Sequence, residues 1–272
     1  MKIIESFIES KYGDRSLCED ELFISENYIA VIDGVTPKGK MRWDGHTSGY
    51  YAKELLRKAL ESLKGNEDSV QVFQFLNQIL QEQYKDNLEF FKEHTEERLR
   101  ATIVIYSHKY RQIWCFGDCQ FMINKKAFKK EMKIDQLLAE VRSVYLHLEL
   151  LGGKTIEELC MNDTSQEIIF PIIKKQLYFS NNSLAGEYAF SVLDGFNSNF
   201  DDLIIQDVEE GSSVVLASDG YPILKETLME SEMFLKTLEE KDPLCIEYHK
   251  MESGFTNGKK AIDDRTYIKF ID

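Results

Sequence analysis

Short stretches of alternating apolar and polar residues recur along the chain, and they predict β-strands with one buried face. The pair Glu26-Asn27 separates two of these stretches, so we expect a tight hairpin turn there. The predicted strands are Ile3–Ile8, Leu22–Ser25, Tyr28–Ile32, Ala101–Ser107, Gln112–Phe116, Phe121–Asn124, Tyr188–Leu193, Leu203–Gln206, Ser213–Ser218 and Thr266–Ile271.

Apolar residues spaced three and four apart predict helices between these strands. SGYYAKELLRKALESL indicates one helix, and VQVFQFLNQILQEQYKDNLEFF indicates a second helix after Gly65. We expect a further helix over Lys133–Leu148, mixed helix and loop over Ile156–Asn181, and helices again from residue 219 to about Met251. Strands and helices thus occur in blocks. This order favours an α+β fold, with antiparallel sheets covered by helices, over a doubly wound parallel sheet.

Size and composition indicate one globular domain. The chain has 272 residues, 43% of them hydrophobic, which is enough for a substantial core. It contains no internal repeat, low-complexity tract or linker rich in proline, glycine or serine. We therefore expect residues 1–272 to form a single domain.

Charge and hydropathy narrow the class of protein. The formal net charge is −14, from 47 acidic and 33 basic residues, which argues against nucleic acid as a partner. No apolar run approaches the roughly 18 residues of a membrane helix. Glu5 and Glu9 interrupt the N-terminal segment where a signal peptide needs an apolar core. We expect a cytoplasmic protein that does not bind membranes.

The cysteines do not indicate a disulfide framework or a structural zinc site. Their number is odd, no CxxC pair occurs, and no histidine lies at zinc-finger spacing. We expect reduced thiols at all five positions, which are Cys18, Cys115, Cys119, Cys160 and Cys245.

Asp-Gly pairs follow several of the predicted strands. Asp33 follows YIAVI, Asp219 follows SSVVLAS and Asp194 follows AFSVL, whereas Asp44 follows no strand. Aspartate and glycine dominate turns for steric reasons, so each pair taken singly is explained as a turn. The same position at a strand end also suits a ligand-binding carboxylate, and the pattern alone leaves both interpretations open.

Other acidic residues also lie at predicted strand ends. They are Glu19-Asp20, Gly117-Asp118 and Asp263-Asp264. Carboxylates that converge repel each other unless cations lie between them. Ligation by oxygen alone favours Mg²⁺ or Mn²⁺ over Zn²⁺. The alternative is a set of independent turns and caps.

The order of these motifs resembles that of the metal-dependent serine/threonine phosphatases of type 2C, the PPM family. The resemblance extends from Gly13 to Phe270. It rests on five motifs, which are Gly13, Arg15, Glu19 and Asp20 in GDRSLCED, Asp33-Gly34, Gly117-Asp118, Ser218-Asp219-Gly220, and Asp263-Asp264 with Thr266.

The resemblance implies a four-layer αββα sandwich with two divalent ions, Mn²⁺ or Mg²⁺, at one end. It implies that Asp33 bridges both ions and that Asp219 and Asp263 complete the ligands of one of them. The Gly34 carbonyl would help to hold the other ion, and Arg15 would hold the substrate phosphate. Three further acidic positions carry over: Glu19 and Asp20, which act largely through bound water, and Asp118, which is linked to a third, weaker ion.

The implied activity is hydrolysis of phosphoserine or phosphothreonine in a phosphorylated protein by a water that bridges the two ions. Two positions depart from the family pattern. Val35 stands where many members have a histidine that protonates the leaving group, and His46 is a nearby substitute. Asp264 stands where an asparagine is customary.

Two alternative functions remain beside the protein phosphatase. One is a catalytically silent member that binds a partner, against which the retained acidic residues argue. The other is a phosphatase for small metabolites. The loop Thr36–His46 and the segment Gly152–Glu187 would decide substrate choice, and the sequence does not indicate an oligomeric state.

Overall fold

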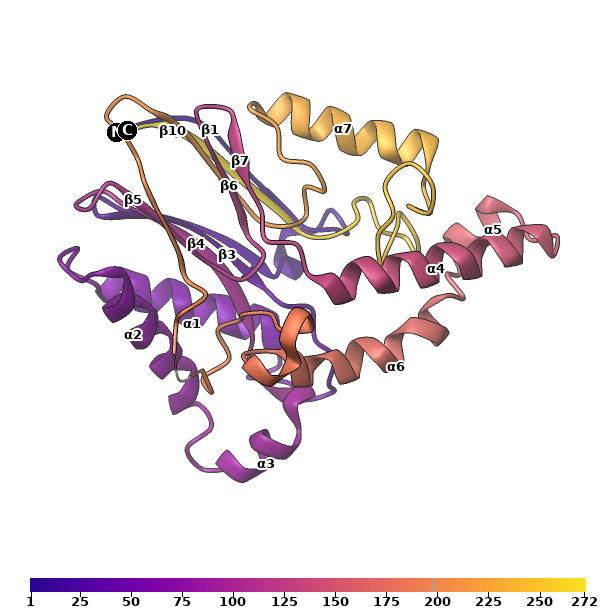
Figure 1. Ribbon diagram of the computed structural model, residues 1–272, viewed down its shortest axis with the longest axis horizontal. Helices are drawn as coiled ribbons and strands as arrows, with labels where there is room; N and C mark the ends of the chain where they lie inside the picture. The colour runs from indigo at the N-terminus through magenta and orange to yellow at the C-terminus, as the bar shows by residue number, and fades with distance from the viewer. Residues whose placement is uncertain (198) are drawn as a thin grey trace.

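Two five-stranded antiparallel sheets pack face to face in the computed structural model, which describes residues 1–197 and 199–272 (Figure 1). The first sheet has the order β1 (Lys2–Glu9), β10 (Arg265–Ile271), β9 (Ser213–Ala217), β6 (Gln120–Ile123) and β7 (Lys126–Phe128). The second has the order β2 (Asp20–Ile24), β3 (Tyr28–Gly34), β4 (Ala101–Ser107), β5 (Gln112–Phe116) and β8 (Ile204–Asp207). The α+β sandwich expected from the sequence is confirmed.

The central strands β3 and β4 are apolar on both faces because both faces are covered. Successive side chains of a strand point to opposite faces. Ile32 and Ile103 accordingly pack with helices outside the sandwich, whereas Val31 and Val104 pack against the other sheet. This two-sided burial explains why YIAVI and ATIVIY read as continuous apolar runs.

Helices cover the two outer faces (Figure 1). The helices α1 (Ser48–Ser62) and α2 (Ser69–Glu82) lie on the second sheet and are followed by the short α3 (Leu88–Glu93). The helix α7 (Leu228–Lys241) covers the first sheet. Side chains of Thr47, Asp68 and Thr227 cap the first turns of α1, α2 and α7.

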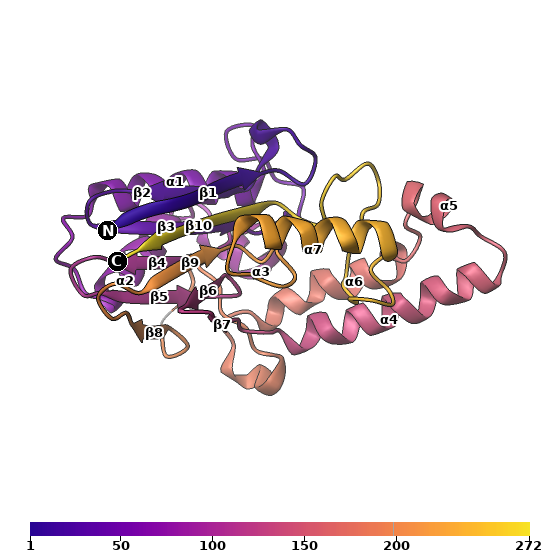
Figure 2. The same cartoon turned by 90° about the horizontal axis from the view of Figure 1, so that it is seen from above.

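A helical arm extends beyond one end of the sheets (Figure 2). It consists of α4 (Lys133–Leu151), α5 (Ile156–Met161) and α6 (Gln166–Gln176). The described ranges also contain four 3₁₀ helices, namely η1 (Arg15–Leu17), η2 (Thr95–Glu97), η3 (Leu177–Phe179) and η4 (Ser183–Tyr188). Among the described residues, no helix is both long enough and apolar enough to cross a membrane.

Three sequence predictions need correction. The segment Tyr188–Leu193 is not a strand: it forms only isolated bridges at Phe190 and Leu193. The Asn181 side chain both donates to the Val192 carbonyl and accepts from its N–H, which supplies the bonds that a neighbouring strand would make. The predicted helix over residues 70–91 breaks between α2 and α3, and the helix after residue 219 ends at Lys241 rather than near Met251.

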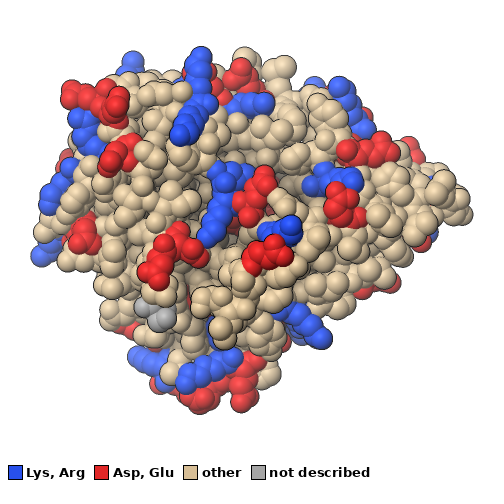
Figure 3. All heavy atoms as spheres, viewed as in Figure 1, with Lys and Arg blue, Asp and Glu red and all other residues tan. Residues whose placement is uncertain are grey.

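The surface carries both signs of charge. On the face shown in Figure 3, basic and acidic side chains are interspersed, and the coloured basic residues do not gather into one patch.

Candidate metal centre

Three aspartates converge at one end of the sandwich. Asp33 ends β3, Asp118 lies in the turn between β5 and β6, and Asp219 follows β9. One carboxylate oxygen from each lies within 4.8 Å of the others, and all three residues are partly exposed. Both sheets contribute to this group, which we call the aspartate trio.

A glycine allows Asp118 to take its place in the trio. Gly117 has a φ of 101°, and a Cβ atom there would lie 2.3 Å from Cγ2 of Thr102 on the neighbouring strand β4. The missing side chain lets Thr102 donate a hydrogen bond from Oγ1 to Oδ1 of Asp118 at 2.8 Å. The Gly-Asp motif therefore has a steric reason as well as a chemical one.

The electrostatics of the trio favour a bound cation. Burial raises the pKa of Asp33 well above its ordinary value, and the neighbouring carboxylates, Asp219 foremost, raise it further. Burial and the charges of Asp118 and Asp263 raise the pKa of Asp219 to about 7. Crowded carboxylates of this kind are stabilised by a divalent cation, and an all-oxygen donor set fits Mg²⁺ or Mn²⁺.

Asp20 lies next to the trio without joining it. It stands opposite Asp33 in the β2–β3 ladder. The Thr266 hydroxyl donates a hydrogen bond to Oδ2 of Asp20 at 2.9 Å, and Asp20 is only 1% exposed. Burial is the main reason that its pKa lies well above the ordinary range.

Asp263 is engaged by a residue that the sequence analysis missed. The Lys11 ammonium donates a hydrogen bond to Oδ1 of Asp263 at 2.7 Å and lies 3.9 Å from Oε2 of Glu19. The carboxylate of Asp263 does not belong to the group of three within the described residues. The only sequence signal was a lysine placed just before the Gly13 motif.

Asp264, the residue that replaces the customary asparagine, has a structural role. It is 3% exposed, and its two carboxylate oxygens accept from the backbone N–H groups of Lys11 at 2.8 Å and Glu19 at 2.6 Å. It therefore ties the segment before β10 to the segment between β1 and β2.

Gly34 and Arg15 differ in their exposure to solvent. The buried Gly34 donates its N–H to the Glu19 carbonyl at 3.0 Å. Arg15 is exposed in η1 and forms no ion pair with any described residue. In the part of the chain that the structure describes, no hydrogen bond or ion pair joins Arg15 to the aspartate trio, so its role stays a prediction.

Three other residues considered in the sequence analysis, Asp194, Asp44 and His46, are not part of the aspartate trio. Asp194 is 1% exposed and accepts from Arg98 at 3.1 Å and from Asn181 at 3.1 Å, which makes it a structural residue. Asp44 lies in an exposed turn. His46, in the same turn, stacks on Tyr50 with ring centroids 4.4 Å apart.

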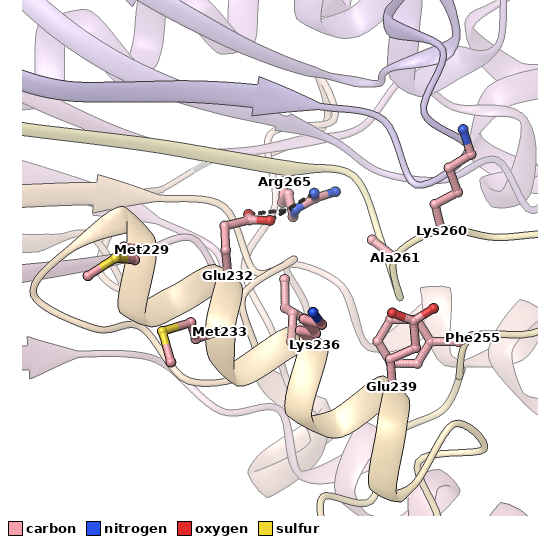
Figure 4. Close-up of a pocket in the computed structure, with 10 residues that line it drawn as sticks. Met229, Glu232, Met233, Lys236, Glu239, Phe255, Lys260, Ala261 and Arg265 are labelled. Atoms are coloured by element: carbon pink, nitrogen blue, oxygen red, sulfur yellow. Dashed lines mark hydrogen bonds and ion pairs between the residues drawn. The ribbon is translucent and has the colours of Figure 1, made fainter.

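A separate cavity of about 380 Å³ lies between α7 and the segment before β10 (Figure 4). Arg265 and Glu232 form an ion pair in its wall, with Nε of Arg265 2.8 Å from Oε1 of Glu232. None of the predicted site residues lines this cavity. The candidate centre is the aspartate trio.

No known family profile matches the chain, and no curated protein sequence matches it. Solved structures do. The serine/threonine phosphatase PstP/Ppp of Mycobacterium tuberculosis is 15% identical over 99% of this chain and 98% of its own, with a TM-score of 0.51. The catalytic domain of PstP with two manganese ions (14% identity, 100% and 99% coverage, TM-score 0.49) and RsbX with magnesium (14%, 100% and 99%, 0.48) are also similar.

The likeness to the Mycobacterium tuberculosis phosphatase establishes the fold. Two antiparallel five-stranded sheets with flanking helices, aligned over nearly the full length of both chains, define the fold of the PPM-type (type 2C) serine/threonine phosphatases. The fold expected from the sequence motifs is confirmed.

Proposed function

We propose that the protein is a metal-dependent phosphatase that hydrolyses phosphoserine or phosphothreonine in proteins. The observation that carries this proposal is the convergence of Asp33, Asp118 and Asp219 at the end of a PPM-type sandwich. Sequence motifs far apart in the chain predicted these residues as ligands, and the fold brings their carboxylates together.

The residues near the trio would hold two ions, Mn²⁺ or Mg²⁺, with a third, weaker one. Asp33 would serve both ions, and the other proposed ligands are Glu19, Asp20, Gly34, Asp118, Asp219 and Asp263. Bound ions of this kind lower the pKa of a water, orient it and neutralise charge on phosphate oxygens. The raised pKa values of Asp33 and Asp219 support a site built for cations.

Arg15 is the proposed phosphate-binding residue. Its guanidinium is exposed and has no ion-pair partner among the described residues. A guanidinium is always charged and donates two parallel hydrogen bonds, which suits a phosphate group. Arg15 would therefore orient the phosphoryl group of the substrate.

The state of the cysteines supports action in the cytoplasm. All five are free thiols, and four of them are buried. Unpaired thiols are typical of proteins in a reducing compartment. We propose that residues 1–272 act there as one domain on a phosphorylated protein.

A second candidate is a catalytically silent protein that binds a partner. The contact between Lys11 and Asp263 favours it, because the ammonium already neutralises one proposed metal ligand. Metal-dependent turnover distinguishes the two functions. For a metabolite phosphatase, phosphorylated metabolites would be cleaved in preference to phosphopeptides.

The test is hydrolysis of p-nitrophenyl phosphate and of a phosphothreonine peptide with and without Mn²⁺. We expect turnover that requires Mn²⁺ and falls roughly a hundredfold or more in Asp33→Asn and Asp219→Asn. Asp44→Asn, which changes an Asp-Gly pair in an exposed turn, is the matched control and should keep full activity. Unchanged turnover in Asp33→Asn contradicts the proposed site, and Mn²⁺ binding without turnover supports the silent protein.

A further inference from the structure

Lys11 is a buried cation among the acidic residues of the candidate centre. Its side chain is 8% exposed, and its ammonium lies 2.7 Å from Asp263, 3.9 Å from Glu19 and 4.0 Å from Asp264. The ammonium also donates to Oγ1 of Thr36 at 2.9 Å. Oxygen atoms from three carboxylates and one hydroxyl therefore surround this nitrogen.

The backbone of Lys11 is fixed in this position. Its N–H donates to Oδ1 of Asp264 at 2.8 Å. Its carbonyl accepts from the N–H groups of Lys260 at 2.7 Å and Ala261 at 3.2 Å. Only the side chain can move away from the carboxylates without breaking these bonds.

The charge balance keeps the ammonium in place. Burial disfavours a charged side chain, but the carboxylates of Asp263, Asp264 and Glu19 compensate for it by lying within 4.0 Å of the ammonium. Lys259 lies near the same carboxylate, yet its ammonium donates to Oγ of Ser253 at 2.7 Å instead. Among the lysines of the described residues, Lys11 is thus the one that forms an ion pair with Asp263.

We propose that Lys11 is an internal competitor for one of the two divalent ions. Its ammonium contacts Asp263 and lies close to Glu19, so the ion for which Asp263 is a proposed ligand binds only when the Lys11 side chain moves away. The other ion, for which Asp33 and the Gly34 carbonyl are proposed ligands, binds without this displacement. The proposal rests on the proposed function, because it concerns occupancy of the same centre.

Competition has a measurable consequence. If the state with the lysine displaced is a minor one, the apparent affinity for the second ion is reduced by the population of that state. Removing the ammonium removes this reduction. The affinity for the first ion should change much less, because Lys11 makes no hydrogen bond or ion pair with Asp33 or Gly34 in the described structure.

The experiment is a Mn²⁺ titration of the full chain, with free Mn²⁺ followed by electron paramagnetic resonance. For the native protein we expect one tight and one weak ion. In Lys11→Met, which keeps the length of the side chain, the weak ion should bind roughly ten- to a hundredfold more tightly. Lys11→Arg keeps the charge, and Lys260→Met removes an exposed lysine from the anchoring segment; both should bind Mn²⁺ like the native protein.

Thermal melting is a second measurement, and it still tests the proposal if Lys11→Met folds poorly. Without metal, Lys11→Met should melt at a lower temperature than the native protein, because three carboxylates lose their cation, and Mn²⁺ should raise its Tm more than that of the native protein. Lys11→Gln, which retains a hydrogen-bond donor, should give the same pattern. Equal affinity for the second ion in native protein and Lys11→Met overturns the proposal.

The outcomes separate this proposal from the proposed function. Tighter second-ion binding in Lys11→Met, without phosphatase activity in either protein, supports the competition and contradicts the phosphatase. Turnover with two tight ions in the native protein supports the phosphatase and overturns the competition. Absence of Mn²⁺ binding in both proteins overturns both proposals.

Discussion

Gly49 in the first turn of α1 lies directly against Gly34 at the end of β3. A Cβ atom on Gly49 would stand 2.6 Å from the Gly34 carbonyl oxygen, and one on Gly34 would stand 2.3 Å from the Gly49 carbonyl oxygen. Backbone therefore touches backbone next to Asp33. The contact holds the beginning of α1 against the strand end that presents the first aspartate of the trio.

Gly49→Ala is expected to destabilise the protein. Alanine in place of a helical glycine normally stabilises a protein by about 1 kcal/mol. Here the added methyl group would collide with the Gly34 backbone, so we expect a loss of about 1–3 kcal/mol. Urea unfolding measures the change, with Lys58→Ala on the exposed face of α1 as a near-neutral control. A variant as stable as the native protein would contradict the proposed close contact.

Arg142 and Asp163 form the ion pair on which the helical arm depends. Both side chains are fully buried, with Nη2 of Arg142 2.7 Å from Oδ2 of Asp163. Nη1 of Arg142 also donates to the carbonyls of Leu244 at 2.5 Å and Met251 at 3.2 Å. One guanidinium thus joins α4 to the turn between α5 and α6 and to the segment after α7.

Arg142→Met is expected to cost about 3–5 kcal/mol, because it leaves a buried carboxylate without its cation. Thermal and urea unfolding measure the loss. In the double variant Arg142→Met with Asp163→Asn, the unpaired charge is removed and part of the stability should return. A double variant as unstable as the sum of its two single changes would mean that the two residues act independently.

Local sequence patterns predicted most strands of the sandwich, because the burial of apolar side chains determines where these strands lie in the chain. The strands Ala101–Ser107 and Gln112–Phe116 match their predicted ends, since their apolar runs are buried on both faces. The segment Tyr188–Leu193 was misjudged for a tertiary reason. Its residues suit a strand, but the Asn181 side chain supplies the hydrogen bonds of Val192, and the pairing with β4 is limited to one bridge between Leu193 and Ala101.

The candidate site was predictable only in part. The order of the motifs indicated Asp33, Asp118 and Asp219, because carboxylates at strand ends leave a recognisable Asp-Gly or Gly-Asp signature, and the structure brings these three together. The contact of Lys11 with Asp263 joins residues 252 positions apart, and a lysine just before the Gly13 motif does not indicate which residue it contacts. Contacts of this kind follow from the folded arrangement of the two sheets.

The stability of the metal-free protein should fall as the pH rises from about 4 to about 7. The folded-state pKa of Asp219 is raised from 3.8 to about 7, chiefly by burial, so the folded protein keeps a proton that the unfolded chain releases. Folding is therefore favoured at the acidic end of this range and loses that contribution as the pH passes the folded pKa. Asp33 and Asp118 have the same sign of shift.

Melting in EDTA at several pH values tests this expectation. Asp219→Asn should reduce the fall in the free energy of unfolding between about pH 4 and pH 7 by about 1–2 kcal/mol. This value allows for the partial exposure of the carboxylate. It should raise the Tm at pH 8 more than at pH 5. Asp44→Asn changes an exposed carboxylate and should leave the pH profile unchanged. A Tm that rises with pH in both EDTA-treated proteins would contradict the charge repulsion within the trio.

Arg15→Ala is expected to weaken substrate binding without weakening the fold. Arg15 is exposed and makes no ion pair with a described residue, so its loss should change the free energy of unfolding by less than about 0.5 kcal/mol. If the guanidinium holds the phosphate, KM for a phosphothreonine peptide should rise roughly tenfold or more, and Arg15→Lys should recover only part of the loss. Arg57→Ala breaks surface ion pairs with Glu54 and Glu61 and should leave KM unchanged. Equal KM values for Arg15→Ala and the native protein would place phosphate recognition elsewhere on the chain.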